Sequence, residues 1–241
     1  CNYLFLGCGP ISNYLIMRNS IKNFDNNLTI KSTKQFILPV KLNYLNNFDS
    51  KFFNKFPIFQ LDLNENTDFS LYSQIYNLNP NIINFLLPRL TKFNKYLYFI
   101  KFFKNLGISY FNLGSSLADE FTIDNKLNIK VFEKKYNVSK ILNYYKSLFN
   151  KKFTDNQVRH LKFPIKMKPL SGNHFGSVYP MTLNKKNFFH SDMYGRIANF
   201  KKISITDSSI FPQLSARPPT FTVLANSLRV VKEVSRLNFF K

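Results

Sequence analysis

The sequence predicts a mixed α/β fold, and three stretches of the 241-residue chain carry this prediction. Near the start, the apolar run Tyr3–Leu6 ends at a glycine turn and leads into a helix. The last third, Gly172–Lys241, contains a short strand, a turn of small residues and a helix that follows two prolines. Between these two regions, strand patterns alternate with helix patterns.

The strand predicted over Tyr3–Leu6 is a continuous apolar run, as expected of a buried strand. It meets the turn Gly7-Cys8-Gly9-Pro10, and the helix that follows has Ser12 as its expected N-cap. A Gly-x-Gly pair at a strand-to-helix turn is typical of dinucleotide-binding loops, but the third glycine of that motif is absent here. On its own, the turn therefore does not identify a nucleotide site.

The middle of the chain is predicted to alternate strands with helices. Pro39 and Pro57 place the first two strands near a sheet edge or at a strand start, and Asn137 is the expected cap of the last helix in this region. The predicted strands are Gln35–Leu42, Phe56–Leu63, Ile108–Leu113, Leu127–Glu133 and Lys162–Met167, and the predicted helices are Leu71–Leu87, Leu90–Leu106 and Val138–Phe149.

The formal net charge of +21 suggests nucleic-acid binding. Almost all basic residues are lysines, however, and they come with abundant Asn, Ile, Phe and Tyr, which an A/T-rich genome over-produces through its codons. Two interpretations stay open. The charge is either incidental, on solvated lysine faces, which we favour, or it forms a functional basic surface.

Cys1 and Cys8 are the only cysteines, so the sequence has no disulfide framework and no C-x-x-C metal motif. A reduced, cytoplasmic setting is the default expectation. No stretch approaches the roughly 18 unbroken apolar residues of a membrane span. Because the chain opens on a cysteine and not on methionine, we expect a processed or truncated chain.

Four elements follow one another in the last third of the chain. They are the turn His174-Phe175-Gly176-Ser177, the polar step Asp192-Met193-Tyr194-Gly195-Arg196-Ile197, the strand end Asp207-Ser208-Ser209-Ile210-Phe211-Pro212, and the helix start Pro219-Thr220-Phe221-Thr222-Val223-Leu224-Ala225. The first turn of any helix leaves several backbone N–H groups without a partner inside the helix. Proline fixes the backbone at this helix start. Together with the helix dipole, these groups suit an anionic ligand.

These elements, in this order, resemble the C-terminal segment of the glucose–methanol–choline family of flavin oxidoreductases. That family carries a His-x-Gly-Gly-like turn, a D-x-x-x-R-V step, a strand ending D-x-S-x-x-P, and N-P-T-x-T at its last helix. Near the N-terminus, the segment Gly9–Ser20 resembles the family's G-A-x-x-[ST]-x-x-L-L-x-x-S signature, which members carry midway along their chains. We therefore expect the C-terminal half of a longer protein, whose G-x-G-x-x-G loop lies upstream.

The resemblance implies an α/β fold with an α+β insertion. Residues 1–25 and 169–241 would form part of a Rossmann-like FAD-binding domain, and residues 26–168 an antiparallel-sheet substrate domain. The implied cofactor is FAD, and the implied reaction moves a hydride from a CH–OH group to the flavin. The implied partner is a small hydroxyl compound, such as a sugar-derived alcohol, while the electron acceptor stays open.

The same resemblance implies that His174 is the general base, because a neutral imidazole suits removal of a hydroxyl proton near neutral pH. On sequence alone, a structural role for His174 and a plain strand-end turn at Asp207 stay open as alternatives. By resemblance, the residues against FAD are Gly9, Asp207, Ser208, Pro219 and Thr220, and those against the substrate are Asn173 and Arg217.

Other residues are expected to be structural or solvated. His160 and His190 are predicted on the surface, and Asp62, Asp119 and Glu120 in solvated turns, because nothing pairs these carboxylates with a metal-ligand set. Leu224, Leu228, Val231 and Val234 are predicted to be the core positions of the last helix.

The sequence departs from the family at Pro218, where members place Asn or His. The proline side chain can neither donate nor accept a hydrogen bond, and Ser215 or Arg217 are the neighbours that could substitute. Two rival functions stay open. Pro218 suggests a family relative that has lost turnover, and the basic composition suggests a non-catalytic domain that binds nucleic acid through lysines and aromatic residues.

Overall fold

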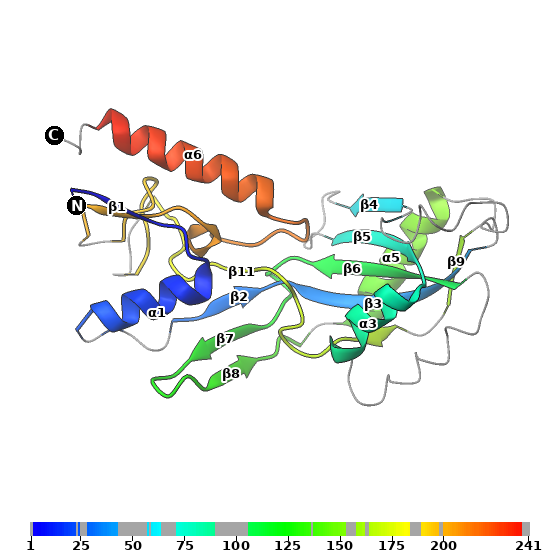
Figure 1. Ribbon diagram of the computed structural model, residues 1–241. Coiled ribbons are helices and arrows are strands. Elements are labelled where there is room, and N and C mark those ends of the chain that lie inside the picture. The colour runs from blue at the N-terminus through cyan, green and yellow to red at the C-terminus, as the bar shows by residue number, and fades with distance from the viewer. Residues whose placement is uncertain are drawn as a thin grey trace. The chain divides into compact units, whose positions relative to one another are not determined.

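The computed structural model describes residues 2–22, 24, 28–42, 57, 59–63, 71–89, 106–135, 137–152, 158–161, 164–183, 189–197 and 200–237 (Figure 1). The chain forms two compact units. The first consists of Cys1–Thr33, Gly114–Lys134 and Gly172–Lys241, and the second of Lys34–Leu113 and Lys135–Ser171. The region predicted as one middle domain thus divides differently, because residues 114–134 group with the two ends of the chain.

The second unit is built on a six-stranded antiparallel sheet of order β10-β3-β6-β5-β4, in which β9 also pairs with β3. Its strands are β3 (Lys34–Leu42), β4 (Phe59–Leu63), β5 (Leu71–Asn77), β6 (Leu106–Leu113), β9 (Val158–His160) and β10 (Ile165–Lys166). Its helices are α3 (Pro80–Leu86), the 3-10 turn η2 (Leu87–Arg89) and α5 (Val138–Lys152). The predicted antiparallel sheet and mixed α/β character are confirmed.

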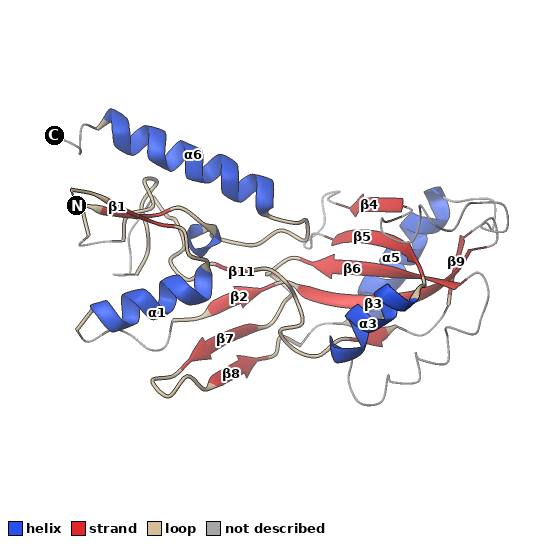
Figure 2. Cartoon of the chain, in the orientation of Figure 1, coloured by secondary structure: helices blue, strands red, loops and turns tan. Residues whose placement is uncertain are grey.

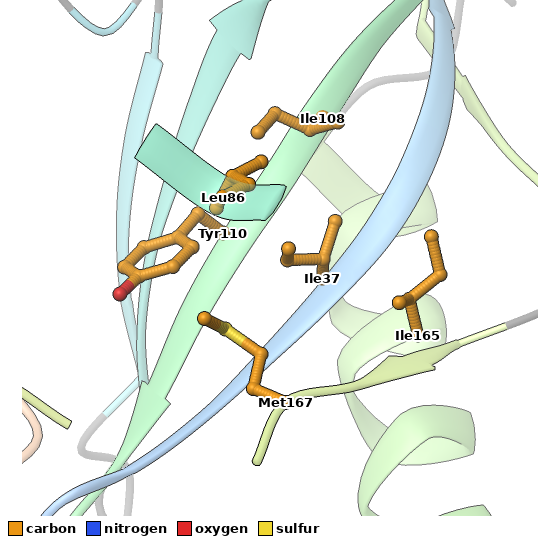
Figure 3. Packing of buried hydrophobic residues seen from close by; sticks show 6 residues of the cluster. All are labelled: Ile37, Leu86, Ile108, Tyr110, Ile165 and Met167. Carbon is orange, nitrogen blue, oxygen red and sulfur yellow. The ribbon is translucent and has the colours of Figure 1, made fainter. Parts of the chain in front are cut away.

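Side chains alternate between the two faces of this sheet, and each face packs against a helix. One face carries the buried cluster Ile37, Leu86, Ile108, Tyr110, Ile165 and Met167, in which Leu86 comes from α3 (Figure 3). On the other face, Phe111 stacks on Phe36 with ring centroids 5.4 Å apart, and on Tyr145 of α5 at 5.3 Å. Each buried side chain of this size contributes about 1.5–3 kcal/mol.

The predicted helix over Leu71–Leu87 is wrong in its first half. Leu71–Asn77 is strand β5, which pairs with β4 on one side and β6 on the other. Its apolar spacing suited either element, but Tyr72, Ile75 and Tyr76 are residues that favour strands. Helix α3 begins only at Pro80. A proline suits this first helical position because the N–H that it lacks would have no partner within the helix there.

The edge position predicted from Pro39 is also wrong. Strand β3 pairs with β6 on one side and with β9 and β10 on the other. Pro39 lies between those two ladders, because β10 pairs with residues 36–37 and β9 with residues 40–42. The missing N–H of proline therefore interrupts neither ladder.

Three further predictions in this region concern α5, β10 and the segment before β6. The helix from Val138 is confirmed as α5, and Asn137 Oδ1 caps it by accepting from the backbone N–H of Lys140 at 3.0 Å. Of the strand predicted over Lys162–Met167, Ile165–Lys166 forms β10, and residues 162–163 lie outside the described residues. The helix predicted over Leu90–Leu106 lies outside the described residues, except for Leu106, which begins β6.

The first unit contains two small sheets. Strand β1 (Leu4–Leu6) pairs in parallel with β12 (Ile203–Ile205), and β11 (Phe175–Gly176), β2 (Ile30–Ser32), β7 (Glu120–Ile123) and β8 (Ile129–Phe132) form an antiparallel sheet in that order. Its helices are α1 (Pro10–Ser20), the 3-10 turn η4 (Ser208–Ile210) and α6 (Thr220–Arg236). Much of the chain between β11 and α6 is loop (Figure 2). Residues from both ends of the chain belong to this unit.

Two predictions about the helices of this unit are wrong. Helix α1 begins at Pro10 with Gly9 as its N-cap, so Ser12 lies inside the helix. On α6, the predicted core position Val234 is buried, but Leu224, Leu228 and Val231 are exposed, and Val230 is the second buried residue. The side that packs is the one bearing Ser227, whose hydroxyl donates to the backbone carbonyl of Thr206. Within the described ranges, no helix is both long and apolar enough to cross a membrane.

Candidate cofactor site and active site

Asp207, two residues after β12, is buried, and its side chain accepts four hydrogen bonds. Its Oδ2 accepts from the backbone N–H of Gly9 and from Asn13 Nδ2, both at 2.7 Å. Its Oδ1 accepts from the backbone N–H and the hydroxyl of Ser209, at 2.8 and 2.5 Å. Bonds to an ionised acceptor are the stronger ones. The carboxylate therefore fastens the turn before α1 to the turn after β12.

Gly9 makes this arrangement possible through its backbone. Its φ of +88° lies in the region that costs little for glycine alone. Pro10 then occupies the first helical position, for which its fixed φ is suited. The structure thus brings together two of the predicted cofactor residues, Gly9 and Asp207, through a direct hydrogen bond.

Ser208 lies against the loop that follows His174. Its hydroxyl donates to the carbonyl of Phe175 at 2.8 Å, and its own carbonyl accepts from the N–H of Ser177 at 3.0 Å. Gly176 lies between these contacts, and a Cβ built on it would be 2.6 Å from the carbonyl oxygen of Ser208. Only glycine permits so close an approach of the two backbones.

His174 directly precedes β11 and is half-buried. Its backbone carbonyl accepts from the N–H of Thr33 at 3.1 Å. Among the residues that the structure describes, no hydrogen bond reaches its imidazole. Burial lowers the pKa of His174 below its ordinary value of 6.5. The ring is therefore neutral at pH 7 and able to accept a proton.

The start of α6 has no side-chain cap. Pro219 is the N-cap residue, its carbonyl accepts from the N–H of Val223 at 2.8 Å, and Thr220 is the first helical residue. The N–H groups of this first turn carry the partial positive charge of the helix. Such an end of a long helix suits an anionic ligand group.

The other predicted site residues are exposed. Asn173, Arg217 and Thr220 are open to solvent, as is Pro218, while Pro219 is half-buried. In the described part of the chain, no hydrogen bond joins the side chain of His174 to any of them. The structure therefore links Gly9, Asp207, Ser208 and the loop after His174.

The Asp192–Arg196 step is a tight turn. Asp192 Oδ1 accepts from the N–H groups of Tyr194 and Arg196 at 3.0 and 2.9 Å, and Oδ2 accepts from Arg196 Nε at 2.9 Å. Gly195 has a φ of +71°, and a Cβ on it would lie 2.3 Å from the carbonyl oxygen of Ile205 in β12. This step accordingly supports β12.

The surface position predicted for His160 is wrong. Its ring packs edge-on against Phe149, with centroids 4.1 Å apart, because α5 covers this end of β9. Burial and the charge of Lys146 lower the pKa of His160 to about 3. Among the described residues, its Nε2 has no hydrogen-bond partner. His190 is half-buried rather than fully exposed.

The solvated position predicted for Asp119 is also wrong, since this residue is buried and its carbonyl accepts from the hydroxyl of Ser32 at 2.7 Å. Glu120 is half-buried and pairs with Lys134 at 2.7 Å. The prediction for the side chain of Asp62 lies outside what the structure describes. No group of three or more His, Cys, Asp or Glu that could hold a metal ion occurs in the described ranges.

Sequence reasoning missed Asn13 and Ser177. Asn13 is fully buried, and its Nδ2 reaches Ser209 Oγ at 3.2 Å as well as Asp207. Ser177 has a φ of +57°, which is uncommon for a residue other than glycine. An amide in the first turn of a helix normally faces solvent, and a left-handed serine beside a glycine has no sequence signature. No signal in the sequence pointed to either residue.

No model of a known protein family matches the chain, and no curated protein matches its sequence. Among solved structures, the chain is similar to pyridoxine 4-oxidase from Mesorbium loti, with a TM-score of 0.57 and 10% sequence identity. The match covers 97% of this chain and 51% of that one, so the chain spans about half the length of that enzyme. At this identity, the likeness shows a shared fold.

Proposed function

We propose that this chain is the C-terminal half of a flavin-dependent oxidoreductase of the glucose–methanol–choline type, acting on a CH–OH group. The observation that carries the proposal is the fold likeness along 97% of the chain to pyridoxine 4-oxidase, an oxidase by name. The motif resemblances support the proposal separately, because they rest on sequence alone. Pyridoxine and sugar-derived alcohols are the first substrates to test.

In this proposal the first unit is the FAD-binding part and the second unit carries the substrate domain. The parallel pairing of β1 with β12, the glycine turn and α1 are the pieces of a partial Rossmann-like domain. The antiparallel sheet of the second unit is the candidate substrate platform. Both assignments rest on the resemblance and on the fold likeness.

The residues present fit one side of a flavin. The uncapped start of α6 at Pro219 and Thr220 suits the edge of the ring system where negative charge gathers on reduction. By the family resemblance, Gly9 and Ser208 would also lie against FAD, while Asp207 already accepts four hydrogen bonds and serves as framework. FAD, when bound, would supply the hydride acceptor.

His174 is the proposed proton acceptor. Its imidazole is half-buried, has no hydrogen-bond partner among the described residues, and has a pKa that burial lowers. A neutral ring can take the hydroxyl proton at Nδ1 or Nε2 as the substrate carbon is oxidised. Pro218 offers no second proton partner, so His174 would carry this step without the help that an Asn or His would give.

Asn173 and Arg217 are the proposed substrate contacts. Both are exposed and flank the candidate site in sequence, one beside His174 and the other two residues before Pro219. An amide and a guanidinium are suited to orienting hydroxyl or carboxylate groups of a small polar substrate. The electron acceptor is left open.

The experiment that tests this function uses the natural full-length protein, loaded with FAD under anaerobic conditions. Pyridoxine, primary alcohols and sugars are mixed with it, and bleaching of the flavin absorbance is followed by stopped flow. We expect at least one of these compounds to reduce the flavin with saturation kinetics. A protein that holds no FAD, or a bound flavin that none of these donors reduces, would contradict the proposal.

A further inference from the structure

One face of the six-stranded sheet in the second unit changes from apolar to polar. Beside α3 this face carries the apolar cluster of Figure 3. Next to that cluster the side chains are amides and phenols, and we call them the polar patch. Its members are Gln35 of β3, Tyr72, Gln74 and Tyr76 of β5, and Tyr110 and Asn112 of β6.

The register of the strands places these residues side by side. Asn112 is opposite Gln35 on one side and opposite Tyr72 on the other, and Tyr110 is opposite Gln74. Residues two apart on a strand point to the same face. Directly opposite residues have Cβ atoms about 4.5–5.5 Å apart. The patch is therefore a block of adjacent polar side chains on one face.

Three members of the patch are buried and have a polar atom without a partner. Gln35, Tyr110 and Asn112 are 3%, 8% and 5% exposed. Among the described residues, no hydrogen bond reaches Gln35 Oε1, the Tyr110 hydroxyl or Asn112 Oδ1. That hydroxyl points away from Ile37 and Ile165 of the apolar cluster (Figure 3). Leaving a buried polar group unpaired costs folding free energy, so each such group needs a reason.

The opposite face of the same sheet shows buried polar groups that serve the fold alone. Ser73, Ser109 and Tyr145 are fully buried there. Their hydroxyls hydrogen-bond with one another, at 2.9 Å between the serines and at 3.0 and 2.6 Å from Tyr145 to Ser73 and Ser109. This triad satisfies itself within the protein. The polar patch does not, so its unpaired atoms are available to a ligand.

The chemistry of the patch suits an uncharged ligand with several hydroxyl groups. Its six members carry no formal charge. Burial raises the pKa of Tyr110 more than the charge of Arg89 and the nearby amide of Gln35 lower it, so the phenol is neutral at pH 7. A hydroxyl group both donates and accepts, so it can pair with a phenol and with either polar atom of an amide. The tyrosine rings offer apolar surface to a carbon skeleton.

We propose that Gln35, Tyr110 and Asn112 form a hydrogen-bonding site for an uncharged ring compound that carries at least two hydroxyl groups. The ligand would enter beside Gln74 and Tyr76, the two half-buried members of the patch, whose side chains hydrogen-bond with each other at 2.9 Å. Binding requires residues of the second unit only. That the bound compound is also the one oxidised rests on the proposed function.

The test titrates the 241-residue chain, without flavin, with glucose, xylose and myo-inositol. The side-chain amide signals of Gln35 and Asn112 are followed by ¹H–¹⁵N NMR. We expect at least one compound to shift both signals with saturation. Tyr110→Phe and Asn112→Leu remove one unpaired atom each at similar side-chain size, and each should weaken binding by roughly five- to tenfold. Gluconate, which is anionic, should bind more weakly than the neutral compounds.

Thermal unfolding separates a ligand site from a structural role. Since no described residue pairs with the atoms removed, Tyr110→Phe and Asn112→Leu should leave the unfolding midpoint of the chain unchanged or raise it. Ser73→Ala is the matched control on the opposite face. It should lower the midpoint, because Ser109 and Tyr145 each lose a partner, and should leave the affinity for the ligand unchanged.

Three outcomes would overturn the proposal. They are no saturable binding by any of the neutral compounds, tighter binding of gluconate, and a fall in the midpoint for Tyr110→Phe or Asn112→Leu as large as that for Ser73→Ala. These outcomes are independent of the flavin reaction. Saturable binding without flavin reduction would support the site and contradict the proposed function, whereas flavin reduction without such binding would do the reverse.

Discussion

At the scale of single residues, the imidazole of His174 is the group on which the proposed chemistry depends. Replacing it with glutamine keeps a polar side chain of similar reach but removes the proton acceptor. We expect flavin reduction by substrate to slow by about 10²–10⁴-fold in the His174→Gln full-length protein, with FAD still bound. Anaerobic stopped flow measures this rate.

The control for this experiment is His190→Gln, which changes another half-buried histidine of the same unit and should reduce flavin near the wild-type rate. Should the two variants slow the reaction equally, or should His174→Gln react as fast as the wild type, His174 would be structural and the site assignment would be wrong.

The loop after His174 requires a residue without a side chain at Gly176. A Cβ there would lie 2.6 Å from the carbonyl oxygen of Ser208, so Gly176→Ala must push the two backbones apart. Overpacking of this kind costs about 1–3 kcal/mol of unfolding free energy. Urea titration measures the loss. Gly7→Ala, whose Cβ would meet only the hydroxyl of Thr206 at 3.1 Å, should cost less, and an equal cost would contradict the packing argument.

The candidate site shows what residue patterns can and cannot predict. The family resemblance grouped Gly9, Asp207 and Ser208 as cofactor residues, and the structure joins Gly9 to Asp207 by a direct hydrogen bond. The buried partner Asn13 and the left-handed Ser177 were invisible, since their roles come from neighbours almost 200 positions away or from a backbone angle.

At the scale of elements, the packing of α5 on β9 makes stability depend on pH. The pKa of His160 falls to about 3 in the folded state from 6.5, so between these values the unfolded chain binds a proton that the folded chain does not. The contribution is present above pH 6.5 and is lost as pH falls toward 3, at up to about 1.4 kcal/mol per pH unit.

We therefore expect His160→Leu to flatten the pH dependence of unfolding below pH 6.5, and to remove a buried nitrogen that has no hydrogen-bond partner among the described residues. Urea unfolding of the wild type and the variant at several pH values between 4 and 7.5 would measure this. Parallel curves for the two proteins would show that His160 is protonated as readily in the folded protein as in the unfolded one.

Element type was predictable where the apolar pattern fits one structural period, and failed where it fits two. Strand β3 and helix α5 were found from their patterns, whereas β5 was taken for a helix. Its apolar residues fit either period, and only the ladders with β4 and β6 decide the choice. For α6 the period was clear, but which side packs depended on contacts far away in sequence.

At the scale of the whole molecule, the chain alone should retain FAD poorly. The sequence contains no G-x-G-x-x-G motif, so the glycine loop that grips a pyrophosphate is not supplied by these residues. Gel filtration of the 241-residue chain with FAD should separate the two. A yellow 1:1 complex that survives the column would contradict this expectation.

The charge of +21 should be incidental to function. Lysines on a solvated surface attract nucleic acid through released counterions alone, and this attraction falls steeply with salt. Binding to single-stranded DNA or RNA, measured by fluorescence anisotropy, should be weak and independent of sequence, and should vanish near physiological salt. Tight binding that persists at that salt would favour the basic-domain alternative.

The bond between Gly9 and Asp207 spans 198 positions of the chain, and this distance has a consequence for biosynthesis. When β1 leaves the ribosome, its partner β12 has not yet been translated, so the strand must wait for nearly the whole chain. The second unit, made of residues 34–113 and 135–171, is complete earlier. Closing so long a loop is entropically costly and slow. The unit that carries the candidate site is thus the last to form, and a ribosome that stalls before residue 203 leaves an apolar strand exposed to chaperones and proteases.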